Sequence, residues 1–482
     1  MKKPNIIKVR LKQLRGLKRF LRKYRKHKTK LRMRPRRKVY PQKVSNRRYS
    51  NSVFSTNSQK NMTRECMIKK YLPVNLKYML DTKDSPFYIK KVKDTIVSED
   101  VIIVPKQFSI FENPKECFQM LRDLIHALLY TDFSQVILDY NKCESIDLCS
   151  QILLDIIFKD WNTFVTEVGN NHGIKATKLF PITVGGKNIN NINVQKILFS
   201  VGSPANVAGR EYDFPNIKKS KLCIHNRKMN RDRETIMAYK DIATTELADY
   251  VIDCLRSVNK KLTPERLDDL CIVIGETLIN AEEHSTTGCR YSVGYFEELE
   301  NDGKHYGMFR LVILNFGHTI YEKFKNLESS NVDVVKQMKS LSEQYTKYQL
   351  FTKRDFEEES LWTLYALQQG VTSVSADLYT QRGNGSINFI NSFFNLKGDE
   401  KVDDVSWLSI ASGRTRIVFD GAYKITSKNI NGEVFQCMTF NKENDLRYKP
   451  DKKYVYGTDY YFPGTAISVN IMLSDDDIRE LN

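Results

Sequence analysis

Residues 263–284 carry the pattern of an amphipathic helix. Thr263 supplies a cap and Pro264 suits the first helical position. One narrow apolar stripe is formed by Leu267, Cys271, Ile274, Leu278 and Ala281. The polar residues Glu276, Asn280 and His284, spaced four apart, fall on roughly the opposite face. Because further hydrophobic residues widen the apolar arc, we expect both sides of the helix to be covered and the polar residues to face a cavity.

Strands are expected after this helix. Residues 291–296 and 309–314 are rich in aromatic and β-branched side chains, which is typical of strands. The second segment runs into Asn315 and Gly317, a strand-to-turn junction where backbone can approach a ligand closely. A last strand is predicted over residues 466–473, directly after Gly464 and Thr465.

A glycine-rich loop precedes another helical pattern. Arg382, Gly383, Asn384 and Gly385 come just before an apolar-periodic stretch, residues 387–394. A loop of this kind offers free N–H groups and the positive end of a helix dipole to phosphate. The long stretch between Gly317 and Gly383 has a helical pattern around residues 361–369, which indicates an enlarged lid.

These features occur in an order that resembles one family. Taken singly, each also fits an ordinary surface helix or a tight turn. Together, over about residues 240–475, they resemble the Bergerat or histidine-kinase-like ATP-binding domain shared by histidine kinases, DNA gyrase, the heat-shock chaperone ATPase and mismatch-repair ATPases. The residues that match its motifs are Glu276, Asn280, Ala281 and His284 (N box), Asn315 and Gly317 (Asp-x-Gly box), Gly383 and Gly385 (second glycine box), and Gly464 with Thr465.

The resemblance implies a two-layer α/β sandwich, a mixed sheet with helices on one face, that binds ATP and Mg²⁺. It makes Asn280 the Mg²⁺ ligand, Glu276 the general base and Asn315 the reader of the base. It places His284, Gly317, Thr319 and Thr465 around the nucleotide, and Arg382, Gly383, Asn384 and Gly385 on the phosphates.

Two positions depart from the family pattern. The base-reading Asp is replaced by Asn315, and an amide can accept or donate where a carboxylate only accepts. ATP is still favoured, with weaker exclusion of GTP. The glycine expected two residues beyond Gly317 is Thr319, which should stiffen the loop.

The middle of the chain, residues 85–215, alternates between strand and helix patterns. Strands are predicted at 101–104, 136–139 and 182–184, and helices at 115–129 and 147–158. The region resembles a STAS domain, the small α/β module of anti-sigma-factor antagonists. In that family a serine at the start of the helix after an Asp accepts phosphate. Here Leu148 and Cys149 follow Asp147 and Ser150 is out of register, so we interpret the module as a scaffold or sensor for a protein partner.

The first 50 residues form a basic arm. Residues 1–48 hold 22 of the 76 Lys and Arg residues and no acidic residue, so the remaining 54 basic residues are outnumbered by 57 acidic ones. The arm fits the phosphate backbone of DNA or RNA, an anionic membrane surface, or an interaction or solvated tail, with an organelle presequence as a further reading. No apolar run has the length of a membrane span and no signal peptide is evident. The nine cysteines include no Cys-x-x-Cys pair, and a cytoplasmic protein is expected.

Three functions remain open. The favoured hypothesis is an α/β protein that binds Mg²⁺–ATP, hydrolyses it slowly, and changes its engagement of a partner when the lid closes. The first alternative is a serine/threonine or histidine-type protein kinase of the anti-sigma-factor class. The second is a nucleic-acid-binding scaffold with a degenerate nucleotide site. A homodimer fits the first two, since many Bergerat proteins dimerise when loaded.

Overall fold

The computed structural model describes most of the chain after the basic arm. The described ranges are 64–172, 182–226, 233–258, 264–283, 285–301, 304–326, 332–346, 355–369, 371, 385–397, 406–430 and 433–474. They belong to one compact unit, Met62–Asn482. Residues 1–48 lie outside the described residues, as do His284, Arg382, Gly383 and Asn384.

The first half of the described chain is built on parallel strands. Strands β1 (Val101–Ile103), β3 (Gln135–Asp139) and β5 (Thr183–Lys187) form a parallel sheet in the order β1-β3-β5. A short parallel pair joins β2 (Gln107–Phe108) to β4 (Ser145–Ile146). The helices are α2 (Arg64–Tyr71), α3 (Val74–Asp81), α4 (Ile89–Lys93), α5 (Pro114–Tyr130), α6 (Leu148–His172), α8 (Ile192–Ser200) and α9 (Ser203–Asn206). The strands and helices predicted for this region are thus present, and most of their ends agree within a few residues, but α6 continues to His172, well beyond the predicted end at residue 158.

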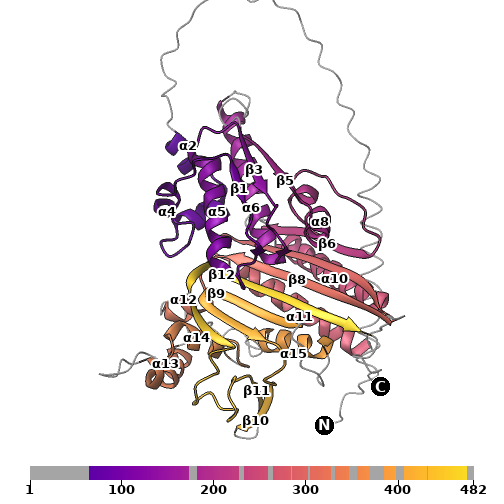
Figure 1. The fold of residues 1–482 in the computed structure, drawn as a ribbon. Coiled ribbons are helices and arrows are strands. Elements are labelled where there is room, and N and C mark those ends of the chain that lie inside the picture. The colour runs from indigo at the N-terminus through magenta and orange to yellow at the C-terminus, as the bar shows by residue number, and fades with distance from the viewer. Residues whose placement is uncertain are drawn as a thin grey trace, which may run out of the picture. The chain divides into compact units, whose positions relative to one another are not determined.

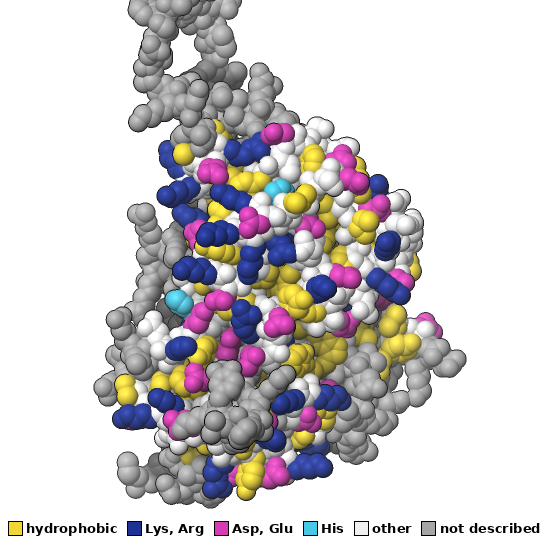
Figure 2. Space-filling view, turned by 60° about the vertical axis from the view of Figure 1, so that its left-hand side comes forward, with side chains coloured by type: hydrophobic (Ala, Val, Ile, Leu, Met, Phe, Trp, Pro, Cys, Tyr) yellow, Lys and Arg dark blue, Asp and Glu magenta, His cyan; other side chains and the backbone are white. Residues whose placement is uncertain are grey.

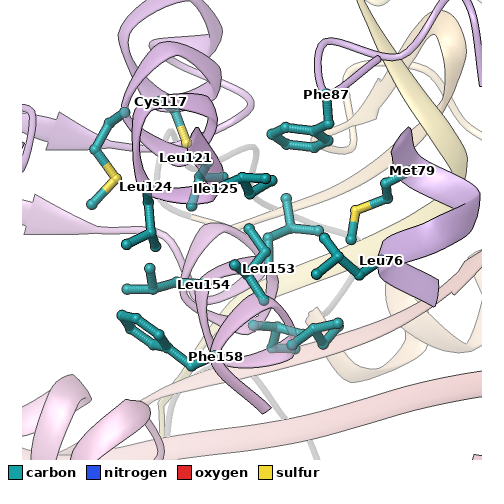
Figure 3. Packing of buried hydrophobic residues seen from close by; sticks show 14 of the residues in the cluster. Leu76, Met79, Phe87, Cys117, Leu121, Leu124, Ile125, Leu153, Leu154 and Phe158 are labelled. Carbon is teal, nitrogen blue, oxygen red and sulfur yellow. The ribbon is translucent and has the colours of Figure 1, made fainter. Parts of the chain in front are cut away.

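Helices α3, α5 and α6 pack closely through their apolar side chains. Figure 3 shows these side chains converging from α3 (Leu76, Met79), α5 (Leu121, Leu124, Ile125) and α6 (Leu153, Leu154, Phe158). Every one of them is at least 95 % buried. Burial of a side chain of this size contributes about 1.5–3 kcal/mol, so this contact is a main source of stability for the first half.

The second half contains a five-stranded sheet. Its strand order is β6-β7-β8-β12-β9, and every neighbouring pair is antiparallel. The strands are β6 (Ile217–Asn226), β7 (Cys289–Asn301), β8 (Lys304–Phe316), β9 (Trp407–Phe419) and β12 (Val455–Ser474). The expected mixed sheet is therefore wrong for this region. Strand β8 pairs antiparallel with β7, and β12 runs antiparallel between β8 and β9. A separate hairpin joins β10 (Thr426–Ile430) to β11 (Glu433–Cys437).

One face of this sheet is covered by helices of the second half of the chain. Helices α10 (Arg233–Ser257), α11 (Pro264–Glu283) and α15 (Gly385–Lys397) contact the sheet, and α11 lies against both α10 and α15. Helix α12 (Ile320–Lys325) and helix α14 (Glu358–Ala366) contact β9, and α13 (Val332–Thr346) packs on α14. Helix α11 begins at Pro264 as predicted, and α14 overlaps the helical pattern expected around residues 361–369, although it begins and ends three residues earlier.

The sheet is buried on both faces (Figure 1). Val312 and Leu314 pack into the same core as α3 and α6, whereas Leu311 and Ile313 pack into a second core with α10, α11 and α15. The two-layer arrangement with helices on one face is therefore corrected to three layers around this sheet. The physical reason is that β8 carries apolar side chains on both faces, and both faces have to be covered. Among the described residues, no helix has the length and apolar character to cross a membrane.

A buried carboxyl on α6 gives the fold a pH dependence. Asp155 is fully buried and accepts hydrogen bonds from Gln151 Nε2 (2.9 Å) and the Ser203 hydroxyl. Burial, only partly offset by these bonds, raises the pKa of Asp155 from 3.8 to about 7. The folded protein therefore binds this proton more tightly than the unfolded chain does, and stability falls as pH rises from about 4 to about 7.

Asp155→Asn should remove that dependence. Between pH 5 and pH 8 the variant is expected to gain about 2–3 kcal/mol in free energy of unfolding relative to the parent protein. Urea unfolding at both pH values measures this gain. The control Asp333→Asn, at a side chain 86 % exposed, should show no such change. Equal behaviour of the two variants would mean that Asp155 is ionised in the folded state throughout this range.

Candidate functional site

A row of polar side chains crosses all five strands of the antiparallel sheet. The strand registers pair His225 with Arg290, Arg290 with Asn315, Asn315 with Thr465, and Thr465 with Ser412. The next residues along three of these strands, Tyr291, Phe316 and Ala466, belong to the core on the α6 side. Since side chains alternate between faces along a strand, this polar row lies on the face covered by α11.

The last turn of α11 is tied to the polar row by charge. Glu282 Oε2 lies 3.2 Å from Arg290 Nε and 2.7 Å from His225 Nδ1. Burial raises the pKa of Glu282, but its contacts with His225 and Arg290 outweigh burial and leave that pKa below its ordinary value. The carboxylate is therefore charged at neutral pH, and it joins the end of α11 to β6 and β7.

Two hydrogen-bond donors in the row are buried without an acceptor. Arg290 is 2 % exposed and Asn315 is 1 % exposed. Arg290 Nη2 and Asn315 Nδ2 make no hydrogen bond to any part of the chain that the structure describes. A buried donor left unpaired costs about 1–3 kcal/mol. Two of them on adjacent strands, at paired positions, mark this end of the sheet as a place where a ligand would supply acceptors.

Thr465 and Ser412 form the other end of the polar row. Their hydroxyl oxygens are 3.0 Å apart, and Ser412 Oγ also donates to the Gly464 carbonyl (3.1 Å). Gly464 lies directly against Asn315, since a Cβ atom on it would be 2.1 Å from the Asn315 carbonyl oxygen. The structure thus brings together two of the predicted motifs, Asn315 with Gly317 and Gly464 with Thr465.

The turn after β8 is held by hydrogen bonds. The Gly317 N–H donates to the Pro463 carbonyl (3.3 Å). Thr319 is the N-cap of α12, and it forms a capping box with Glu322 in which each side chain accepts the other residue's N–H. The Thr319 hydroxyl and N–H are therefore committed to the helix cap.

The end of α11 is also linked to this turn. The segment after α11 contributes Ser285, whose hydroxyl donates to the Phe316 carbonyl (2.9 Å), and Thr286, whose hydroxyl accepts the His318 N–H (3.1 Å). Asn280 precedes Glu282 by two residues, so on α11 it points to roughly the opposite side from Glu282, away from the polar row, and it is half-buried. Gly385 is the first residue of α15, which lies beside α11. The Glu276 side chain lies outside the described part of the chain.

The sequence interpretation did not select Glu282, Arg290, His225 or Ser412. Two of them carried a signal. Glu282 lies four residues after Leu278 and continues the apolar stripe of α11, and Arg290 alternates with apolar residues in a buried strand. A charge at a position predicted to be buried indicates a specific partner. His225 and Ser412 carry no such signal, because they join the row only through strand register.

The chain was compared with family models, curated proteins and solved structures. None of them matches the chain.

Proposed function

We propose that this protein binds a Mg²⁺–purine nucleoside triphosphate at the C-terminal end of α11, beside the polar row, and that slow hydrolysis of the nucleotide regulates how the protein engages a partner. The observation that carries the proposal is Asn315. It is 1 % exposed, its amide nitrogen is unpartnered among the described residues, and it lies beneath the helix that carries Asn280. The resemblance of the motifs to ATP-binding domains supports a purine nucleoside triphosphate as the ligand.

The polar row suits the base of a nucleotide. A purine is flat and apolar on its faces and carries donors and acceptors only on its edge. A mostly apolar site with a few polar groups fits such a ligand. The phosphates would extend toward the start of α15, where the positive end of the helix dipole and the free N–H groups of a first turn favour anions.

Asn280 would supply the protein's ligand to the metal. The described residues contain no cluster of three His, Cys, Asp or Glu side chains that could hold a metal ion by themselves. Mg²⁺ does not need one, because it is commonly held by one or two protein oxygens, phosphates and water. When bound, the ion would neutralise phosphate charge. In this proposal Glu276, one helical turn before Asn280, orients and deprotonates the attacking water.

The regulatory part of the proposal follows from what covers the sheet. Phe316, at the end of β8 next to Asn315, packs into the core that contains α3 and α6. A change in the conformation of the turn after β8 would therefore alter packing in the first half of the chain. On the face drawn in Figure 2, Lys and Arg side chains are interleaved with Asp and Glu. The charge that would attract DNA or RNA is accordingly assigned to residues 1–48, whose basic residues have no acidic neighbours.

Calorimetric titration tests the proposal. The protein should bind non-hydrolysable ATP or GTP saturably and only with Mg²⁺, and Asn280→Ala should weaken binding by about tenfold or more, since it removes a metal ligand. Asn193→Ala, at an exposed position of α8, is the matched control and should bind like the parent protein. Absence of binding by both nucleotides would reject the proposal. Transfer of labelled phosphate to a protein without phosphate release would replace hydrolysis by kinase activity.

A further inference from the structure

We infer that the site is selective for a 6-oxopurine nucleotide, with guanine rather than adenine as the preferred base. This inference rests on the proposed function, because it concerns the base of the same nucleotide. The inference follows from the type of hydrogen-bonding group, donor or acceptor, that has no partner in the polar row among the described residues.

The unused groups are both donors. Arg290 Nη2 and Asn315 Nδ2 are buried and unpartnered among the described residues, and their residues are paired across β7 and β8. Side chains directly opposite in an antiparallel pair start about 5 Å apart and reach the same ligand edge. A ligand that satisfies both groups has to present acceptors there.

Asn315 alone would not choose between the bases. Its amide can turn over, so that it donates to a carbonyl oxygen or accepts from an amino group. Arg290 removes this freedom, because a guanidinium only donates. Its neighbours do not reverse the preference, since the Glu282 carboxylate is shared by Arg290 and His225 and the hydroxyls of Thr465 and Ser412 pair with each other.

The two purines differ at this edge. Guanine carries a carbonyl oxygen at position 6 and an acceptor at N7, the pair of atoms that arginine commonly recognises. Adenine carries an amino group at position 6, a donor that would face the guanidinium and leave it unpaired. The row therefore favours the oxygen.

Titration with three non-hydrolysable triphosphates tests the inference. With Mg²⁺ present, the guanosine analogue and the inosine analogue, which keeps the 6-oxygen but lacks the 2-amino group, should each bind at least about tenfold tighter than the adenosine analogue. Asn315→Asp replaces the amide nitrogen by an acceptor oxygen and should lower this ratio about tenfold or reverse it. A thermal denaturation curve shows whether that variant is folded, and the parent protein's own ratios require no variant.

Several outcomes would overturn the inference. Equal binding of the guanosine and adenosine analogues, or tighter binding of the adenosine analogue, would show that the 6-oxygen is not read. If the inosine analogue bound like the adenosine analogue, the 2-amino group would be the recognised feature instead. In each of these cases the nucleotide still binds and the proposed function stands. Failure of all three analogues to bind would reject the proposed function itself.

Discussion

Glu282→Gln is expected to lower the free energy of unfolding at pH 7 by about 3–5 kcal/mol, the cost of breaking a buried ion pair from one side. Among the residues that the structure describes, the substitution leaves the Arg290 guanidinium, in a residue 2 % exposed, without a carboxylate within hydrogen-bond distance. His225 loses the same partner. The end of α11 would then lose its polar attachment to β6 and β7, so nucleotide affinity should fall together with stability.

Urea unfolding of Glu282→Gln and a matched control measures the effect. The control is Glu144→Gln, whose exposed pair with Lys106 (3.2 Å) should contribute no more than about 1 kcal/mol. The pKa of Glu282 is lowered in the folded protein, so its stabilisation is present above the unfolded value of 4.5 and is lost as pH falls through the folded value. The difference between parent and variant should therefore shrink at acid pH. If Glu282→Gln were as mild as the control at pH 7, the ion pair would not anchor α11.

Local sequence patterns predicted the helices and strands well, because the formation of a helix or strand depends largely on residues close together in the chain. Pro264 and the apolar stripe were sufficient to place the start and the buried face of α11. Aromatic and β-branched runs located the centres of β7 and β8, although both strands extend further than the runs do. The ends of a strand depend on its pairing with neighbouring strands. In β7 and β8 this pairing extends the strand to polar and glycine residues whose own strand propensity is low.

The composition of the site was harder to predict. Asn315 and Thr465 were found through motifs. That they lie opposite each other on neighbouring strands depends on the register of two strands about 150 residues apart in the chain. Arg290 enters the site through the same kind of pairing. A shift of one residue in any strand would turn its side chain to the other face, so neither the row nor its unpaired donors can be derived from the sequence alone.

Gly464 sets how closely β12 approaches Asn315. Its φ of +152° favours glycine, and a Cβ atom would lie 2.1 Å from the Asn315 carbonyl oxygen and 2.9 Å from Phe316 Cα. Both neighbours are backbone atoms that cannot rotate away. The added methyl group would have to push the two strands apart at the position where Asn315 is held.

Gly464→Ala should therefore lower the free energy of unfolding by about 3 kcal/mol and weaken nucleotide binding in the protein that remains folded. Gly185→Ala on β5 is the matched control, because nothing lies within 4 Å of its added Cβ and its loss of backbone freedom in the unfolded chain should make it neutral or slightly stabilising. Chemical unfolding and calorimetry of the two variants separate a local effect on the site from a general cost of replacing strand glycines. Equal stability of both variants would show that β8 and β12 do not approach this closely at Asn315, and the buried setting of its amide, on which nucleotide recognition depends, would be lost with that contact.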